Sequence, residues 1–221
     1  MALSTLASYF KQRFNGGPAG PASPFRVGMV VTMDPTPFIL AGSTTKLRMP
    51  KIDAQDSVTA VGLLQNGQVQ SHRLYLPDGK SFLHVVADRT GQITECRFFQ
   101  EFDTVYPPQE EWPVWLDATD GLIGLGQFQT LDGKLYDRHW NRGATRVPPQ
   151  VFTETYTHVD GGRPVTLQRT HHAMLYSAGT GLPAPAPQAE YILVAAVEQS
   201  TGAKVSLYAG LDFNPASFSL A

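Results

Sequence analysis

The residue types best suited to recognition or chemistry gather in one stretch of the chain, residues 110–142, which holds all three tryptophans. Tryptophan and arginine are favoured at the centres of binding interfaces. The candidate binding residues of this stretch are Trp112, Trp115, Asp120, Tyr136, Arg138, His139, Trp140 and Arg142. Tryptophan is also ordinary core material, and core or domain-closure packing is the interpretation we prefer for these three rings.

A catalytic interpretation would bring Asp120, Arg138 and His139 around a small polar substrate. Such a site would need a deep pocket in which the pKa values of these groups are shifted. The chain contains no G-x-S-x-G nucleophile elbow, no H-E-x-x-H zinc motif and no Walker loop. We therefore predict no catalytic residue, no cofactor and no metal ligand, and keep the enzyme as an alternative.

Two short motifs in the stretch are similar to ligand sites but have the wrong spacing. The glycines of residues 121–126, GLIGLG, follow the order G-x-x-G-x-G rather than the dinucleotide order G-x-G-x-x-G, so a bend or bulge in a sheet is favoured. Asp117 and Asp120 lack the spacing of a calcium loop, which favours a turn at Asp120-Gly121. Pro113, directly after Trp112, suits the first turn of a short helix over residues 107–116.

Charge is distributed unevenly around the same stretch. Seven acidic residues and no Lys or Arg lie between Phe98 and Gly133. Four basic residues follow within thirteen positions: Lys134, Arg138, Arg142 and Arg146. We prefer the interpretation that the two blocks form ordinary surface ion pairs, each of which contributes little. The alternative is a polarised surface that orients a partner.

The elements that must position these residues divide the chain into three parts. Residues 1–14 are predicted to form an amphipathic helix, because the apolar residues between Leu3 and Phe14 recur at spacings of three and four. Residues 15–24 are rich in Gly and Pro and predict a flexible linker. Residues 25–221 are predicted to form a single β-rich domain, and a division into two subdomains near residue 105 stays open.

Strand-like runs follow one another from residue 25 onward, separated by the Asn-Gly and Asp-Gly pairs of tight hairpin turns. One such run is predicted over residues 122–130. Two others, 151–159 and 165–176, are predicted hairpin partners that could bring His158 to His171 or His172. The predicted fold class is mainly β, an antiparallel barrel or sandwich-like sheets with an N-terminal amphipathic helix.

Composition and targeting signals restrict the compartment and the partners. The formal net charge is −2, and no concentrated basic surface of the kind that binds nucleic acid is visible. The single cysteine, Cys96, fits a reducing compartment and predicts a buried thiol. The N-terminus lacks the pattern of a secretory signal, and the longest apolar run, residues 191–197, is too short to span a bilayer. We expect a cytoplasmic protein with no transmembrane segment, no nucleic-acid partner and, at most, a peripheral membrane contact through residues 2–14.

The central stretch from Phe98 to Trp140 resembles the signature of an uncharacterised, YjfK-like bacterial family of unknown function. The resemblance rests on E-W-x-x-W-L at Glu111–Leu116, D-G-L-I-G at Asp120–Gly124, Y-x-R-x-W at Tyr136–Trp140, and the late stretch 189–215. It covers most of residues 25–221 and brings no catalytic residues with it. It implies a link to envelope stress, because members are encoded near genes for a phage-shock-protein-A-like membrane-remodelling protein, which is evidence by association alone.

The preferred functional hypothesis is a non-enzymatic cytoplasmic interaction module linked to membrane or envelope stress. Its partner would be an unidentified protein, for which the resemblance points to a membrane-associated phage-shock-protein-A-like protein. One alternative is an enzyme that acts on a small polar substrate at a site in residues 117–142. The other is a barrel that binds an apolar ligand, which inward-facing Phe, Leu and Val residues would permit.

Overall fold

The computed structural model describes residues 23–48, 56–66, 69–88, 92–117, 120–199 and 202–221. The helix predicted over residues 1–14 and most of the predicted linker lie outside these residues. Among the described residues, no helix is both long and apolar enough to cross a membrane.

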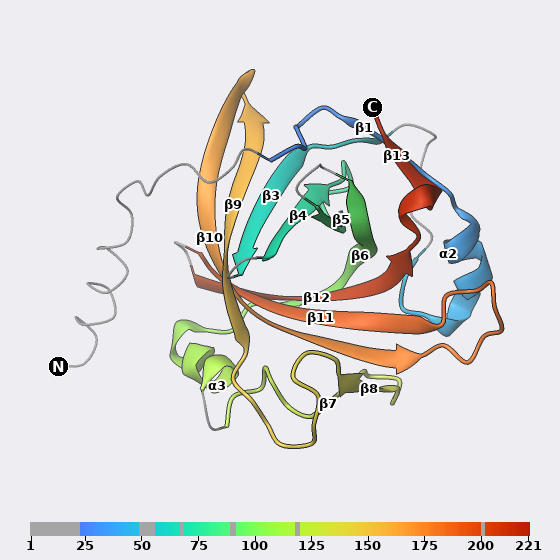
Figure 1. Cartoon of the computed structure of the whole chain (residues 1–221). Helices are drawn as coiled ribbons and strands as arrows, with labels where there is room; N and C mark the ends of the chain where they lie inside the picture. The colour runs from blue at the N-terminus through green and yellow to red at the C-terminus, as the bar shows by residue number, and fades with distance from the viewer. Residues whose placement is uncertain (1–22, 49–55, 67–68, 89–91, 118–119, 200–201) are drawn as a thin grey trace.

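Eight antiparallel strands close into a barrel (Figure 1). The first four form a meander: β3 (Ala60–Asn66), β4 (Val69–Tyr75), β5 (Ser81–Ala87) and β6 (Ile93–Val105). The second four form another: β9 (Gln150–Asp160), β10 (Arg163–Gly179), β11 (Ala189–Gln199) and β12 (Gly202–Phe213). Pairing of β6 with β12 and of β3 with β9 joins the two meanders into a ring. The prediction of a mainly β, antiparallel fold is confirmed, and of the two predicted architectures the chain adopts the barrel.

Local turn chemistry sets the hairpins of the barrel. Asp78, between β4 and β5, accepts the backbone N–H groups of Lys80 and Ser81 at 2.9 and 2.7 Å, and Gly79 has a φ of +67°. Residues 161–162, two glycines with positive φ, join β9 to β10. These are conformations that glycine adopts without strain, so the Asp-Gly signals correctly predicted both turns.

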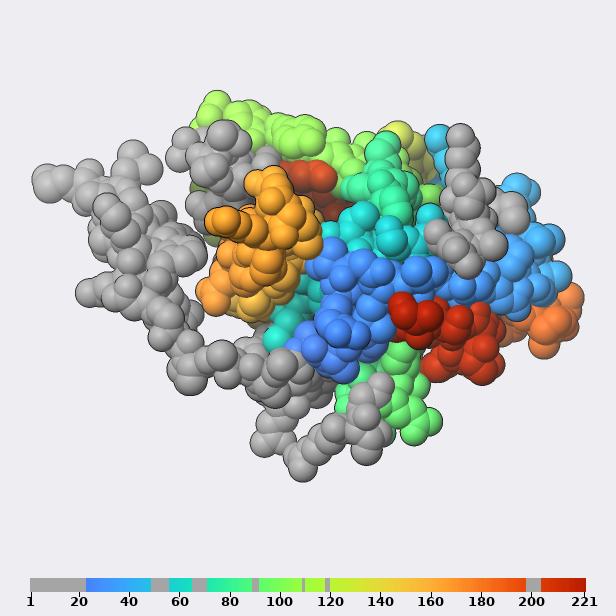
Figure 2. Space-filling view, turned by 90° about the horizontal axis from the view of Figure 1, so that it is seen from above, coloured from blue at the N-terminus to red at the C-terminus, as the bar shows by residue number. Residues whose placement is uncertain are grey.

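The two ends of the described chain pack together on the outside of the barrel. β1 (Val30–Met33) lies between β2 (Asp56–Ser57) and β13 (Phe218–Leu220) in a small sheet, and the helix α2 (Thr36–Ala41) follows β1. Figure 2 shows the early residues in blue beside the C-terminal residues in red. Phe38 of α2 packs edge-on against Phe98 of β6, with ring centroids 4.9 Å apart, so this segment covers part of the outer barrel face.

A second covering comes from the crossover between β6 and β9. It contains a 3-10 turn (Gln109–Glu111), the helix α3 (Trp112–Leu116), β7 (Gln127–Gln129) and β8 (Leu135–Arg138), which lie beside one end of the barrel in Figure 1. The predicted short helix is confirmed. The strand predicted over residues 122–130 is wrong except at 127–129. Its glycines instead pack against backbone: a Cβ at Gly124 would lie 1.9 Å from the carbonyl oxygen of Val147.

A hydrogen bond between side chains of two strands that are not neighbours shows which face of the sheet lies inside the barrel. The hydroxyl of Tyr75 on β4 donates to Oε1 of Glu154 on β9 at 2.6 Å, although β3 lies between these two strands. Gly62 of β3 lies beneath this contact, where a Cβ would be 1.9 Å from the same oxygen. Side chains meet over an intervening strand on the concave side of a sheet, so Tyr75 and Glu154 point into the barrel.

Alternating residues divide the core into an inner and an outer cluster. The inner cluster consists of Leu64, Phe82, Phe99, Phe152, Ala173, Leu175, Tyr191, Leu193 and Ala195. The outer cluster lies beneath the two coverings and includes the buried, unpaired thiol of Cys96, as predicted. The histidines of the β9–β10 hairpin do not meet as predicted, because His158 pairs with Val165 and His171 with Phe152.

Candidate functional site

Four polar side chains form a row across four neighbouring strands of the barrel. Arg73 on β4 pairs in register with His84 on β5, and His84 pairs with Arg97 on β6. Arg97 in turn pairs with Asp212 on β12. Arg73 lies two residues from the inward-facing Tyr75, and directly paired residues share one face of a sheet. The whole row therefore points into the barrel.

A cavity of about 340 Å³ lies along this row. Its lining combines apolar and aromatic side chains with a few polar ones: Leu64, Ser71, Arg73, His84, Arg97, Phe99, Trp140, Phe152, Leu175 and Leu193. Cavities of roughly 300–1,000 Å³ with this mixture are typical of small-molecule sites. An eight-stranded barrel is just wide enough to hold one small ligand.

Arg73 is the most deeply placed cation of the cavity, with 3% of its surface exposed. Its guanidinium carbon lies 4.8 Å from the ring centroid of Phe82 and 5.5 Å from that of Phe152. Its Nε is buried and has no hydrogen-bond partner among the described residues. Two aromatic faces thus hold the guanidinium in place, while part of its hydrogen-bonding capacity stays unused.

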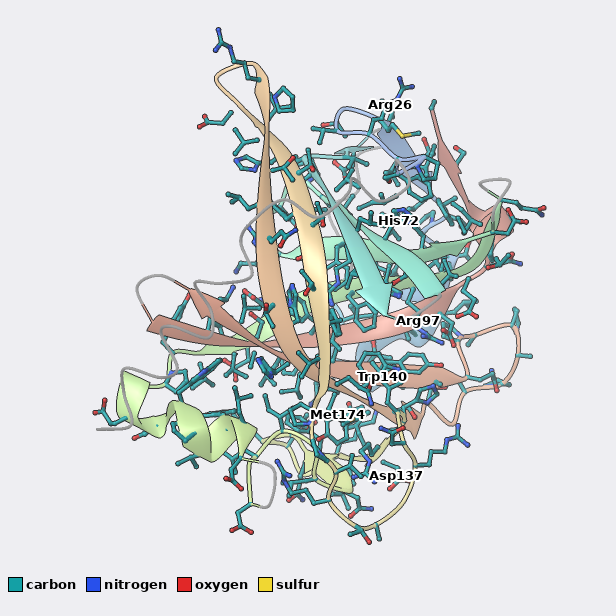
Figure 3. All side chains as sticks on the ribbon, turned by 60° about the vertical axis from the view of Figure 1, so that its left-hand side comes forward. Arg26, His72, Arg97, Asp137, Trp140 and Met174 are labelled. Atoms are coloured by element: carbon teal, nitrogen blue, oxygen red, sulfur yellow. The ribbon has the colours of Figure 1, made fainter. Side chains whose placement is uncertain are left out.

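Arg97 lies toward solvent at the other end of the row. Its Nε donates to Oδ1 of Asp212 at 2.7 Å, and its guanidinium lies 4.7 Å from the ring centroid of Tyr191. The Tyr191 hydroxyl donates to the other oxygen of Asp212 at 2.6 Å, and burial, together with this carboxylate, raises its pKa to about 12. In Figure 3, Arg97 and Trp140 lie near each other, and both line the cavity.

His84 lies between the two arginines and is held neutral at physiological pH. Burial lowers its pKa, and the positive charges of Arg73 and Arg97 lower it further, to about 3. Part of the imidazole nevertheless has accessible surface, because it lines the cavity. A neutral imidazole has one N–H donor and one acceptor nitrogen, so His84 can form a hydrogen bond to a ligand of either kind.

A second polar cluster in the barrel consists of Tyr75, Glu154 and His171, none of which lines the cavity. Glu154 is completely buried; it accepts the Tyr75 hydroxyl at Oε1, and its Oε2 lies 2.8 Å from Nε2 of His171. Burial raises the pKa of Glu154, but the hydrogen bond from His171 and the charge of Arg73 outweigh it and lower the pKa to about 2. Burial also lowers the pKa of His171, so a neutral imidazole donates to a carboxylate. Both oxygens of Glu154 are thus already engaged.

Replacing Gly62 by alanine tests the packing over this cluster. The new Cβ would lie 1.9 Å from Oε1 of Glu154, so the carboxylate must shift away from Tyr75. We expect a loss of about 2–4 kcal/mol in the free energy of unfolding, from overpacking and the weakened hydrogen bond. Urea unfolding measures it. Gly179→Ala is the matched control, because no atom lies within 4 Å of its Cβ, and equal stabilities of the two variants would contradict the packing.

The three tryptophans of the predicted binding stretch are used for packing. Trp112 and Trp115 of α3 are partly buried against the outer cluster. Trp140 is partly buried against both clusters and also lines the interior cavity. Only Trp140 therefore lies at the site inside the barrel.

Tyr136 and Arg138 are buried, with 0% and 3% of their surfaces exposed. The hydroxyl of Tyr136 donates to Oε2 of the buried Glu190 at 2.7 Å. The guanidinium of Arg138 donates to three backbone carbonyls at 2.8 to 3.0 Å, those of Gly124, Asn141 and Gly143. These contacts anchor the crossover, and they leave neither side chain on an open docking surface.

The predicted catalytic group does not assemble among the described residues. The backbone N–H of Asp120 donates to the Asp117 side chain at 2.9 Å. Nδ1 of His139 lies 3.1 Å from Oγ of Ser177. A second cavity of about 790 Å³, beside β8 and the adjoining ends of β10 and β11, includes Asp137, Arg138 and Arg142 in its lining, but neither Asp120 nor His139.

Among the described residues, two members of the acidic block form ion pairs with lysines outside the basic block: Asp132 with Lys46, and Glu101 with Lys204. Lys134 pairs with the buried Glu190 at 2.6 Å. Arg146 donates to the carbonyls of Asp117, Gly121 and Ile123. Backbone carbonyls of the loop thus provide contacts that the prediction assigned to acidic side chains alone.

Sequence reasoning missed the residues of the interior row. One signal was present: His84 stands in the run SFLHVVA, where apolar residues flank it on both sides. A polar residue within such a run is buried whichever face of the strand is inside, and buried polar groups call for partners. Arg73 in HRLYL carries a similar but weaker signal. Nothing local shows that these two residues and Arg97 come together, because that depends on strand pairing.

The chain was compared with protein-family models, curated proteins and solved structures. No protein-family model matches the chain, and no curated protein and no solved structure is significantly similar to it. The resemblance to the YjfK-like family therefore stays a prediction. Within the described part of the chain, no group of three or more His, Cys, Asp or Glu side chains could hold a metal ion.

Proposed function

We propose that the protein is a binding barrel that holds a small, largely apolar organic molecule in its interior. The observation that carries the proposal is the 340 Å³ cavity, whose wall is mainly Leu, Phe and Trp side chains with a few convergent polar groups. Burial of an apolar ligand against such a wall supplies binding free energy of about 25 cal/mol per Å² of apolar surface, before the cost of association.

The arrangement of the inner face supports this proposal. Two strand positions that face the interior carry glycine, and large side chains lie over both. Gly62 lies under Glu154, and Gly210 lies under Phe99, whose ring would be 2.5 Å from a Cβ at that position. These side chains are thereby drawn against the wall, and the space next to Arg73 and Arg97 stays open.

Filling the cavity should abolish binding. Leu175 of β10 lines the cavity and is 1% exposed, so Leu175→Trp would place an indole in the ligand's space. We expect the unmodified protein to bind the neutral fluorophore N-phenyl-1-naphthylamine with an increase in its fluorescence, and Leu175→Trp to weaken this binding by at least about 10-fold. Leu193→Phe, a smaller change on the same wall, should have an intermediate effect.

Leu167→Trp is the matched control, because Leu167 lies on the same strand but is 46% exposed. Native mass spectrometry of the purified protein provides a second, independent measurement, in which a co-purified small molecule is expected. Unfolding curves establish that the variants are folded. Absence of fluorophore binding by the unmodified protein, or equal binding by Leu175→Trp and Leu167→Trp, would refute the proposal.

The interaction module linked to envelope stress stays a prediction. Its amphipathic helix, residues 1–14, lies outside the described residues. Of the eight residues proposed for docking, Tyr136 and Arg138 are buried and the tryptophans pack against the core. These positions favour a ligand inside the barrel over a partner on the 110–142 stretch as the first function to test.

A further inference from the structure

The charged side chains on the cavity wall are all cations. They are Arg73 and Arg97, with the neutral His84 between them, and no Asp or Glu is among the described residues that line the cavity. Guanidinium groups stay protonated at any physiological pH. The rest of the wall is largely apolar, so the cavity combines an apolar body with one cationic side.

The nearby carboxylates do not neutralise this side fully. Glu154 is engaged by Tyr75 and His171 and forms no ion pair with Arg73 among the described residues. Asp212 pairs with Arg97 from the solvent side, and its own side chain is 55% exposed, so water screens its charge. Burial lowers the pKa of Arg73, but Tyr75 and the charge of Glu154 outweigh it and raise the pKa overall, so the guanidinium is compensated in part from inside the barrel.

The spacing of the row suits one acid group. Neighbouring strands lie about 4.8 Å apart, so the backbones at Arg73 and Arg97 are about 10 Å apart, with His84 between them. An acid group over His84 would face both guanidinium groups at once, and the neutral imidazole could donate its N–H to it. Because Glu154 and Asp212 offset part of the positive charge, one negative charge fits better than two.

We propose that the ligand of the barrel is a monoanionic organic acid, whose carboxylate or similar acid group lies between Arg73 and Arg97 and whose apolar body lies against Phe99, Phe152 and Trp140. This inference rests on the proposed function and adds the charge of the ligand to it. The acid group would add a direct ion pair to Arg73, which forms none with a described side chain.

Two probes with a common body test the charge. 1-Anilinonaphthalene-8-sulfonate carries one negative charge, and N-phenyl-1-naphthylamine is the same ring system without it. In Arg97→Met we expect affinity for the anionic probe to fall about 10-fold or more, and affinity for the neutral probe to stay within about twofold. Arg73→Met should act in the same direction. Retained binding of the neutral probe shows, in the same sample, that a variant is folded.

Arg163→Met and Arg142→Met are the controls, because both arginines are exposed and neither lines the 340 Å³ cavity; the first lies in the β9–β10 hairpin and the second beside the 790 Å³ cavity. Neither should change the affinity for either probe. Decanoate should also displace the neutral probe at least about 10-fold better than decanamide.

The results separate the inference from the function on which it rests. Equal losses of both probes in Arg97→Met, an effect of Arg142→Met as large as that of Arg97→Met, or equal displacement by decanoate and decanamide would refute the anionic ligand. In each of these cases, binding of the neutral probe would still support the barrel as a ligand carrier. Failure of the unmodified protein to bind the neutral probe would refute the ligand-binding function itself.

Discussion

Replacement of Glu154 by alanine is expected to lower the free energy of unfolding by about 3–5 kcal/mol, the range found when one partner of a buried charged cluster is removed. The carboxylate is completely buried and engages Tyr75 and His171. Without it, both partners lose their acceptor inside the barrel, and Arg73 loses the opposing charge. Urea unfolding at pH 7 measures the change, and Glu95→Ala, at an exposed position of β6, is the control.

The same variant should also change how stability depends on pH. The folded-state pKa of Glu154 is about 2, below its ordinary value of 4.5. The unfolded chain therefore takes up this proton first, and the contribution of Glu154 is fully present above pH 4.5 and is lost as the pH falls toward 2. Glu154→Ala should have a flatter profile in that window. A loss below about 1 kcal/mol at pH 7 would mean that water reaches the cluster.

Those features of the fold that depend on neighbouring residues could be predicted from the sequence. The Asp-Gly turns at residues 78–79 and 160–161 were predicted from glycine's tolerance of positive φ. The short helix after residue 111 was predicted from Pro113, which cannot donate a backbone N–H but fits the first helical turn. Closure of the ring could not be predicted, because it depends on pairing between β3 and β9, about 90 residues apart, which no local pattern encodes.

The site escaped prediction for the same reason. Arg73, His84 and Arg97 come from three strands and meet through register, whereas the residues from Trp112 to Arg142 attracted attention because they are close in sequence. That stretch is rich in Trp and Arg because it must anchor a long crossover to the barrel. Arg138 and Arg146 do this by donating hydrogen bonds to loop carbonyls. In the sequence, where backbone partners cannot be seen, the same arginines look like part of a charged surface.

The interior of the barrel contains two groups of polar side chains, and the difference between them supports the proposed ligand site. In the Glu154 cluster both carboxylate oxygens are engaged, by Tyr75 and His171, although Nδ1 of His171 is buried without a hydrogen-bond partner among the described residues. The Arg73–His84–Arg97 row borders open space, and its two guanidinium groups are cationic. Polar groups that engage one another stabilise a fold, whereas cationic groups beside a cavity are expected where a ligand supplies their partner.

Replacement of His72 by leucine is expected to stabilise the protein, which is unusual for a change at a buried position. His72 is 3% exposed on the outer face of β4, where Phe25 packs edge-on against it at 4.8 Å. Both ring nitrogens are buried without a hydrogen-bond partner among the described residues. Leucine removes the cost of these unsatisfied groups, so we expect a gain of about 1–3 kcal/mol in the free energy of unfolding at pH 7.

The gain should grow as the solution becomes more acidic. Burial lowers the pKa of His72 to about 4, whereas the unfolded chain keeps the ordinary value near 6.5. Between these values the unfolded state binds a proton that the folded state does not, so the natural protein loses stability as the pH falls from 6.5 toward 4. At pH 5 the leucine variant should gain about a further 2 kcal/mol relative to pH 8, where neither state is protonated. Urea unfolding at pH 8, 7 and 5 measures this, and a gain that is equal at all three pH values would show that water or another donor already reaches the ring.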